Sequence, residues 1–240
     1  SSEGGVAALA AAFGFRVLAF EALWENVVKA RVLVDRVGLS QSVTVVHSAV
    51  ANETGKLLSF DVTTDAATGW QNALQAPASN TFTARSLRLD DVLSEDAVLL
   101  KIDVMGYEGL TLQGAHNWLE RFHVPVVHIV FAPARIVGMD PVMMLQDVAS
   151  KGYSVYLEAC RNGIVPEAVQ ALPARCSDGD LLRRLVTGST GTEHLVAPAH
   201  FDSMVATLRA FEQPNYCCAV GLLLVRSGAF MNSTAGNSTG

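Results

Sequence analysis

The sequence predicts an α/β fold built on one mainly parallel β-sheet with helices on both faces. Short apolar segments of strand length alternate along the chain with longer segments whose apolar residues follow a helical period. The strand-like segments are near-continuous runs of Val, Leu and Ile, which is typical of strands buried on both faces. With 240 residues, half of them hydrophobic, the chain is long enough for one sizeable core.

The first part of the chain shows the alternation clearly. Apolar residues recur from Val27 to Val37 and Gly38 follows them, which indicates a helix. The next segment is rich in β-branched residues, which favour strands. In order, we expect a helix over 6–13 closed by Gly14, a strand over 16–22, a helix over 24–37, a strand over 42–50, an edge strand or hairpin arm over 55–64, and a loop over 70–80.

The alternation continues to residue 159. A strand over 86–93 turns into a helix start, where Asp90 or Asp91 is suited to cap the first turn. Residues 162–200 have mixed signals and are expected to form an insertion of loops and short helices. The other elements expected are a strand over 98–104, a helix over 107–122, a strand over 125–133, a helix over 141–150 ended by Gly152, a strand over 153–159, a helix over 201–211 and a strand over 217–227.

One domain over residues 1–230 accounts for these elements, and the small polar tail over 231–240 is expected to be disordered. The net charge is −6 and the Lys and Arg residues are scattered singly, which argues against nucleic-acid binding. No apolar stretch reaches the length of a transmembrane segment. The first residues lack the basic region of a signal peptide.

The four cysteines have no spacing typical of zinc ligands, and no metal site is indicated. Reduced, structural cysteines are the simplest interpretation, which favours a soluble, cytoplasmic protein. A Cys160–Cys176 disulfide is the alternative if the protein is exported. The sequence leaves the compartment and the oligomeric state undecided.

Polar residues fall where a parallel sheet would place a ligand, beyond the carboxyl ends of its strands. Asp103 ends the apolar run of 98–104, Glu21 ends "VLAFE", and "SSEGG" with Gly4 stands directly before a helix. Taken alone, each has a simpler interpretation. Asp103 would be a helix-capping acid, Glu21 a solvated loop carboxylate, and Gly4 part of a flexible chain end.

Together these segments resemble one family. "LLKIDVMGYEGLTLQGA" is similar to the "KIDVEGYE…VLKGA" signature of the FkbM-like methyltransferases, which use S-adenosylmethionine. "RVLAFEALWEN" resembles that family's "VxAFEPxPxN", "SLRLDDVL" its "TLDDLL", and "VGLLLVR" its last strand. The likeness extends from residue 1 to about 157 and resumes near Tyr216.

The resemblance implies a Rossmann-like methyltransferase fold with a cofactor site at its strand ends. Gly4 would align with the last glycine of the family's D-x-G-x-N-x-G motif, whose strand and leading Asp would lie upstream of Ser1, so the first strand is expected to be truncated. Glu21 would hold the ribose of S-adenosylmethionine. Ser48 and Ala49 match the end of the third strand, where the adenine edge is normally read.

The resemblance also implies methyl transfer, usually to a hydroxyl, here on a small molecule or a glycan. Lys101, Asp103 and Glu108 match the signature, and we expect them to carry the catalytic step. Asp103 is expected to point toward the methionine end of the cofactor or toward the acceptor, with Lys101 and Glu108 near it. In-line alignment of the acceptor oxygen, with a base for its proton, is what the reaction needs.

Two departures from the family leave other functions open. Met105 stands where the family usually has Glu, and Phe131 stands where an acid is common. Both changes remove carboxylates, so a catalytically inactive domain that binds a partner or glycan is one alternative. An NAD-dependent oxidoreductase is the other, disfavoured because no complete G-x-G-x-x-G is present.

The histidines have a structural interpretation. His47 and His128 sit within apolar strands, so we expect them to be hydrogen-bonded core residues and not metal ligands.

Overall fold

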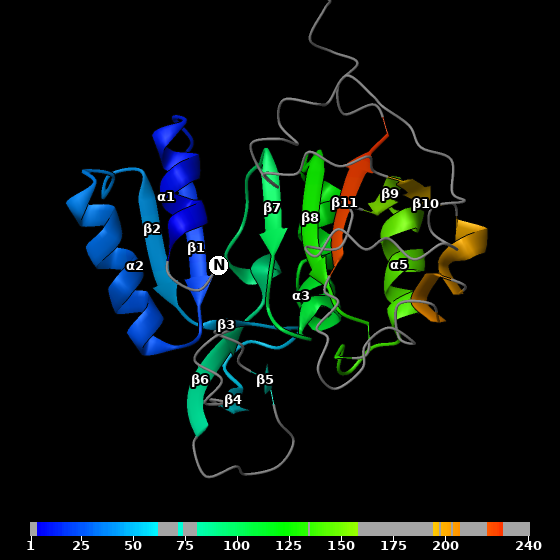
Figure 1. Cartoon of the computed structure of the whole chain (residues 1–240), viewed down its shortest axis with the longest axis horizontal. Helices are drawn as coiled ribbons and strands as arrows, with labels where there is room; N and C mark the ends of the chain where they lie inside the picture. Colours follow the sequence, from blue (N-terminus) through cyan, green and yellow to red (C-terminus); the bar gives the residue numbers. More distant parts are fainter. Residues whose placement is uncertain are drawn as a thin grey trace, which may run out of the picture. The chain divides into compact units, whose positions relative to one another are not determined.

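The structure, a computed structural model, describes residues 4–61, 72–73, 81–133, 135–157, 194–196, 198–202, 204–206 and 220–227. The chain divides into two compact units. Unit 1 comprises Ser1–Leu93 and Leu110–Ala115, and unit 2 comprises Ser94–Gly109 and His116–Gly240. Figure 1 shows the helices and strands of both, which confirm the predicted α/β class. Most of the predicted insertion, the four cysteines and the tail lie outside the described residues.

Unit 1 holds a two-stranded parallel sheet and a separate four-stranded sheet in the order β3-β6-β4-β5. The short strand β5 lies within the segment predicted as a loop, and β6 begins five residues before the predicted strand. The elements are α1 (Gly5–Ala12), β1 (Val17–Glu21), α2 (Trp24–Arg36), β2 (Val43–His47), β3 (Ala49–Val50), β4 (Leu57–Asp61), β5 (Asn72–Ala73), β6 (Thr81–Leu87), the 3-10 helix η1 (Leu89–Asp91) and most of α3 (Glu108–Gly114).

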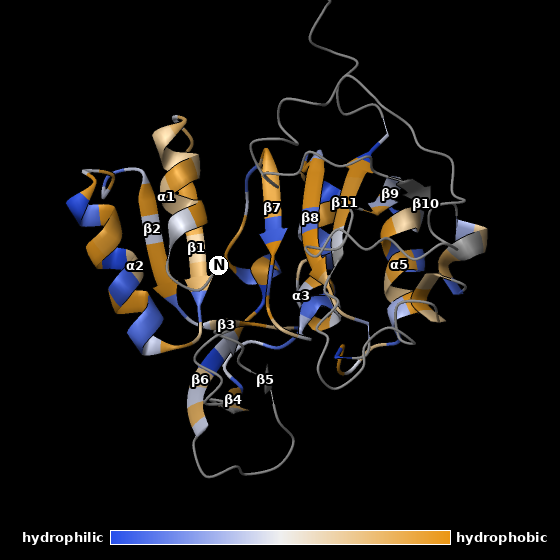
Figure 2. Cartoon of the chain, in the orientation of Figure 1, coloured by the Kyte–Doolittle hydropathy of each residue, from blue (hydrophilic) through white to orange (hydrophobic). Residues whose placement is uncertain are grey.

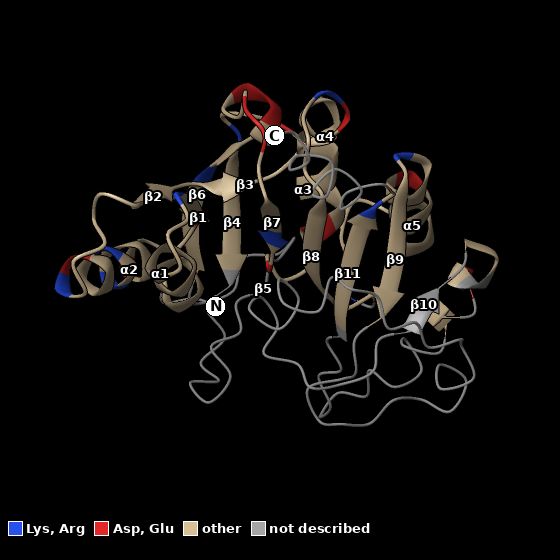
Figure 3. Cartoon of the chain, turned by 90° about the horizontal axis from the view of Figure 1, so that it is seen from above, with Lys and Arg blue, Asp and Glu red and all other residues tan. Residues whose placement is uncertain are grey.

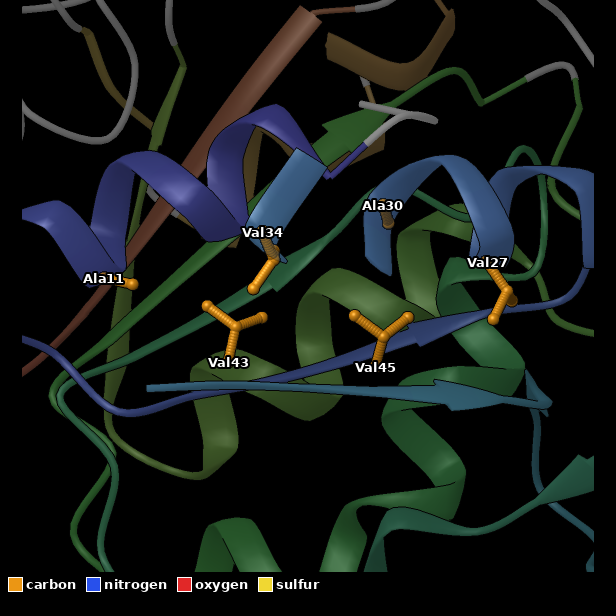
Figure 4. Packing of buried hydrophobic residues seen from close by; sticks show 6 residues of the cluster. All are labelled: Ala11, Val27, Ala30, Val34, Val43 and Val45. Carbon is orange, nitrogen blue, oxygen red and sulfur yellow. The ribbon is translucent and has the colours of Figure 1, made fainter. Parts of the chain in front are cut away.

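The two helices α1 and α2 pack against the β1–β2 pair through small and β-branched side chains. Figure 4 shows this cluster, in which α1 and α2 lie on one side of the strands. Each buried Val contributes roughly 2 kcal/mol by leaving water. The predicted helix α2 is confirmed; Val27, Ala30 and Val34 are buried, while the apolar Val28 and Val32 are exposed. The cluster consists of Ala11, Val27, Ala30, Val34, Val43 and Val45.

The single strand predicted over 42–50 is interrupted at Ser48. The backbone N–H of Ser48 donates to the Glu21 carbonyl at 3.0 Å, and its hydroxyl lies within hydrogen-bond distance of the Arg85 and Ala49 carbonyls. Before the break, β2 pairs with β1; after it, β3 pairs with β6. The chain therefore changes sheets at a residue whose hydroxyl contacts the new partner strand.

Unit 2 holds a five-stranded sheet in the order β10-β9-β11-β8-β7. β7 and β8 are parallel, and β11 runs antiparallel to both β8 and β9, so β7, β8 and β9 share one direction. Figure 2 shows β8 and β11 as hydrophobic over most of their length. The elements are β7 (Leu99–Ile102), α4 (His116–Arg121), β8 (Val126–Phe131), α5 (Pro141–Ser150), β9 (Tyr153–Leu157), β10 (His194–Val196), the 3-10 helix η2 (Pro198–His200) and β11 (Val220–Arg226).

The helix predicted over 107–122 is divided into α3 and α4. At Gly114 a Cβ atom would lie 2.0 Å from the Ala51 carbonyl oxygen, so the backbones of the two segments are in direct contact. Nearby, the Thr111 hydroxyl donates to the Val50 carbonyl at 3.2 Å. These contacts hold the end of α3, and the chain turns at Ala115 before α4 begins. A helical period shows an amphipathic face but not such a backbone contact, so one long helix was the wrong prediction.

Charged residues of the described segments lie mainly on helices and in loops, and the strands of the five-stranded sheet are uncharged over most of their length (Figure 3). In the described residues no helix has both the length and the apolar composition that a membrane crossing requires.

Candidate functional site

Asp103 follows the carboxyl end of β7, as the sequence predicts, and its carboxylate is close to Lys101 in unit 2. The Lys101 Nζ lies 3.9 Å from Asp103 Oδ2, and the two side chains are 20% and 14% exposed. The carboxylate of a strand end is thus kept near a cation while part of its surface remains accessible. Such pairing offsets the desolvation that a largely buried carboxylate suffers.

A left-handed turn comes directly after Asp103. Met105 has φ 51° and Gly106 has φ 102°. A Cβ at Gly106 would lie 2.3 Å from the Arg135 carbonyl oxygen, and the Gly106 carbonyl accepts from Val137 N at 2.9 Å. Glycine is therefore required at position 106, and the loop after β7 is bound to the loop after β8. A non-glycine residue in this conformation is strained, and such strain is concentrated at functional sites.

Glu108 is buried behind this turn, with 2% of the residue exposed. Its Oε1 accepts from the Gly106 N–H at 3.1 Å, whereas its Oε2 is buried and has no hydrogen-bond partner within the described part of the chain. Burial raises the pKa of Glu108 to about 7; the Asp103 carboxylate adds to the rise and backbone hydrogen bonds oppose it. This burial favours a role in holding the turn, and the predicted catalytic role stays a prediction.

His128, on β8, lies beside Lys101, although nothing in the sequence placed it in the candidate site. It is buried, as predicted for a core histidine, and its Nδ1 lies 3.3 Å from Lys101 Nζ. The register of the parallel pair β7–β8 places the two residues opposite each other. The sequence shows a titratable residue within each of two apolar strands, Lys101 and His128. It does not show the strand register that makes these two residues neighbours.

In unit 1, Glu21 ends β1 and its carboxylate turns toward the start of α2. Its Oε1 accepts from Leu23 N at 2.8 Å, and the Asn26 side chain is a further hydrogen-bond partner. Burial raises the pKa of Glu21, and these hydrogen bonds oppose the rise. The prediction of an acid at the tip of this strand is therefore met in the structure; its ribose contact stays a prediction.

His47 lies at the end of β2 and is exposed, so the prediction of a core histidine at this position is wrong. Its Nε2 is 3.0 Å from the Ala22 carbonyl oxygen, and its ring centroid is 5.2 Å from that of Trp24. Alternation along β2 puts it on the same side as the buried Val43 and Val45, but it is the last residue of the strand and is exposed there.

The other predicted cofactor residues have structural partners within unit 1. Ser48 and Ala49 are buried, and the Ser48 hydroxyl is bonded to main-chain carbonyls. Gly4 caps α1 with φ 77°, and a Cβ there would lie 2.7 Å from the Cβ of Ala30. Packing of α1 against α2 is thus one reason for this glycine. Contacts of these three residues with a cofactor stay predictions.

The structure thus forms two groups. Lys101, Asp103 and Glu108 are joined to one turn in unit 2, together with His128; Gly4, Glu21, Ser48 and Ala49 belong to unit 1. Phe131 is fully buried in the sheet of unit 2, where a carboxylate would be costly. No set of three His, Cys, Asp or Glu side chains suited to a metal ion occurs among the described residues.

Comparison with known proteins gives a family match and a match to a solved structure. The family profile described as Methyltransferase FkbM domain matches residues 5–155, more than half of the chain. No curated protein matches the sequence. A crystal structure of the methyltransferase FkbM from Methylobacillus flagellatus KT is 17% identical, with a TM-score of 0.43; the match covers 66% of this chain and 38% of that one. The chain thus spans well under half the length of that protein. By the family match, the chain belongs to the FkbM methyltransferase domain family.

Proposed function

We propose that this domain is an S-adenosylmethionine-dependent methyltransferase that acts on a hydroxyl of a small molecule or glycan. Family membership supports methyl transfer. The observation that carries the proposal is the partly exposed Asp103 carboxylate at the end of β7, beside the Lys101 ammonium and the strained turn at Met105. O-methylation needs a base for the proton of the acceptor hydroxyl. The Asp103 carboxylate can serve as that base, and the turn next to it keeps it in place.

The residues of unit 1 have a chemistry that fits the cofactor. Ribose hydroxyls are hydrogen-bond donors, and an ionised carboxylate has about four acceptor positions. Glu21 accepts hydrogen bonds from two backbone N–H groups and from the Asn26 side chain, and it is partly exposed, so an acceptor position remains for a ribose hydroxyl. Acids at this place in related nucleotide-binding folds bind ribose in this way.

When bound, S-adenosylmethionine supplies a methyl group that is activated by the positive sulfonium. We propose that Asp103 accepts the proton of the acceptor hydroxyl or orients that hydroxyl by a hydrogen bond. The Lys101 ammonium, 3.9 Å away, offsets part of the cost of burying that carboxylate. Glu108 holds the Gly106 N–H and thereby the turn in which Met105 and Gly106 lie.

Met105 motivates a second candidate, a methyltransferase-like domain that binds a partner or glycan without turnover. Its side chain supplies no carboxylate at the turn after β7, where the family usually has Glu. Phe131 does not add to the support for this candidate, because its side chain is fully buried in the core and so does not mark a lost carboxylate at a site.

Calorimetric titration with S-adenosylmethionine tests the cofactor assignment. We expect micromolar binding, weakened about tenfold in Glu21→Gln, which removes a charged acceptor while keeping the shape. Glu25→Gln, the replacement of an exposed acid in the first turn of α2, is the control. Absence of binding by the wild-type chain contradicts the proposal, and binding of NADH instead would favour an oxidoreductase.

Transfer of labelled methyl groups to a panel of sugars and hydroxylated small molecules tests the reaction. Asp103→Asn should remain folded and bind the cofactor but lose at least 100-fold in turnover, the usual size of a general-base contribution. Unchanged turnover in this variant would remove Asp103 from the mechanism. Cofactor binding without transfer to any hydroxyl would favour the inactive domain.

A further inference from the structure

Lys101 and His128 form a polar pair inside the sheet of unit 2. They are opposite each other on β7 and β8, with Lys101 Nζ 3.3 Å from His128 Nδ1. The same Nζ lies 3.9 Å from Asp103 Oδ2. His128 is 6% exposed, and its strand neighbours Val127 and Ile129 are apolar and buried. The ammonium is therefore close to two groups that can stabilise its charge.

The chemistry of the two groups determines the state of the imidazole. An ammonium has three donors and no acceptor, so Nδ1 of His128 must accept the hydrogen bond from Lys101. The imidazole is then neutral with its proton on Nε2. A protonated imidazole would have no free acceptor and would place a second positive charge 3.3 Å from the ammonium.

We propose that His128 is a positioning residue that holds the Lys101 ammonium and, through it, orients the Asp103 carboxylate. A lysine side chain has several rotatable bonds, and an ion pair at 3.9 Å restricts them only in part. The contact at Nδ1 adds a restriction from the neighbouring strand. The effect on the reaction rests on the proposed function, whereas the hydrogen bond and the tautomer do not.

The residues across the sheet add no competing charge to this row. The register partner of His128 on β11 is Leu223, which in turn is opposite Tyr156 on β9. Within the described residues of this row, Lys101 is the charged group facing His128, and Asp103 is the acid beside it.

NMR spectra of the nitrogen-15-labelled chain test the contact without any ligand. We expect the His128 ring, identified by its loss in His128→Asn, to show the Nε2–H tautomer at pH 7–8. Lys101→Met should change its tautomer ratio, whereas His116→Asn, at an exposed surface position, should not. An Nδ1–H tautomer, or an unchanged His128 signal in Lys101→Met, would overturn the proposal.

Two nearly isosteric variants test the consequence for the site. Asn at position 128 keeps an acceptor at the place of Nδ1 and cannot be protonated, whereas Leu removes the acceptor. The rate of methyl transfer should stay within about twofold in His128→Asn and fall about tenfold in His128→Leu. Both variants should keep the wild-type dissociation constant for S-adenosylmethionine, as is expected of Asp103→Asn.

Equal rates of methyl transfer in the folded Asn and Leu variants would overturn the positioning role. If His128→Leu does not fold, the NMR comparison of the wild type with Lys101→Met decides the question, and an unchanged His128 signal would overturn it. If the wild type does not bind S-adenosylmethionine, the proposed function fails, and the NMR measurement still decides whether His128 holds Lys101.

Discussion

Glu108 accepts a hydrogen bond from the backbone N–H of Gly106, 3.1 Å away, while its second oxygen is buried without a partner in the described part of the chain. One oxygen therefore stabilises a left-handed turn, and the other makes ionisation costly. The raised pKa of Glu108, about 7, follows from this burial. The turn after β7 is consequently held by a group that changes charge near neutral pH.

Replacement of Glu108 by Gln should alter the pH dependence of stability. Between pH 4.5 and about pH 7 the unfolded chain releases a proton that the folded chain retains, so the free energy of unfolding falls as pH rises and then levels off. At about 1.4 kcal/mol per pKa unit, the fall is on the order of 3 kcal/mol. Denaturant titrations at pH 4.5 and pH 8 should show this fall in the free energy of unfolding for the wild type but not for Glu108→Gln.

Glu120→Gln is the control for this measurement, because Glu120 is exposed on α4. It should keep the pH dependence of the wild type. Parallel pH profiles of Glu108→Gln and the wild type would show that Glu108 titrates normally in the folded chain.

Gly106→Ala should destabilise the protein by more than about 3 kcal/mol. The added methyl would overlap the Arg135 carbonyl, and the alanine would also have to adopt a left-handed backbone conformation that is disfavoured for it. Gly152→Ala has a similar φ, 84°, and open space around it, so it should cost only about 1 kcal/mol. Chemical denaturation of both variants measures the difference, and equal losses would disprove the close approach at Gly106.

Gly4 and Gly5 should respond oppositely to alanine. Gly4→Ala introduces a methyl 2.7 Å from the Ala30 Cβ and should cost about 2 kcal/mol or more. Gly5 has nothing within 4 Å and lies in α1, so Gly5→Ala should stabilise by up to about 1 kcal/mol. Adding Ala30→Gly to Gly4→Ala should recover part of the loss. Thermal unfolding ranks the three variants, and a neutral Gly4→Ala would count against the helix contact.

The cap of α5 predicts a smaller effect. Asp140 Oδ1 accepts from Val142 N at 2.9 Å and from Met143 N at 3.2 Å. Asp140→Ala should lose about 1 kcal/mol, whereas Asp140→Asn keeps the acceptor and should lose little. The free energies of unfolding of the two variants provide the comparison, and equal losses would show that the cap bonds contribute nothing.

Local patterns in the sequence were sufficient for most of the fold. The helix α2 was predicted because apolar residues recur from Val27 to Val37 and Gly38 follows them. Strands β7 and β8 were predicted because runs of Val, Leu and Ile of strand length are typical of buried strands. The strand-end acids Glu21 and Asp103 were predicted because the ends of such runs are where acids are tolerated.

The remaining features depend on contacts between distant segments. The break at Ser48 comes from bonds to Arg85, and the break after Gly114 comes from the backbone of Ala51. His128 was interpreted as a core residue because its partner, Lys101, is 27 positions away and becomes a neighbour only through strand register. Such contacts leave no periodic signal in either segment.

The place of β11 in unit 2 has a consequence for biosynthesis. This strand comes late in the chain yet pairs with β8 on one side and β9 on the other. Until residues 220–226 have left the ribosome, β8 and β9 each lack β11, the strand that pairs with both of them in the finished sheet. A chain that ends before β11 would therefore expose two unpaired strand edges, and dependence on chaperones should be greatest between the synthesis of β9 and that of β11.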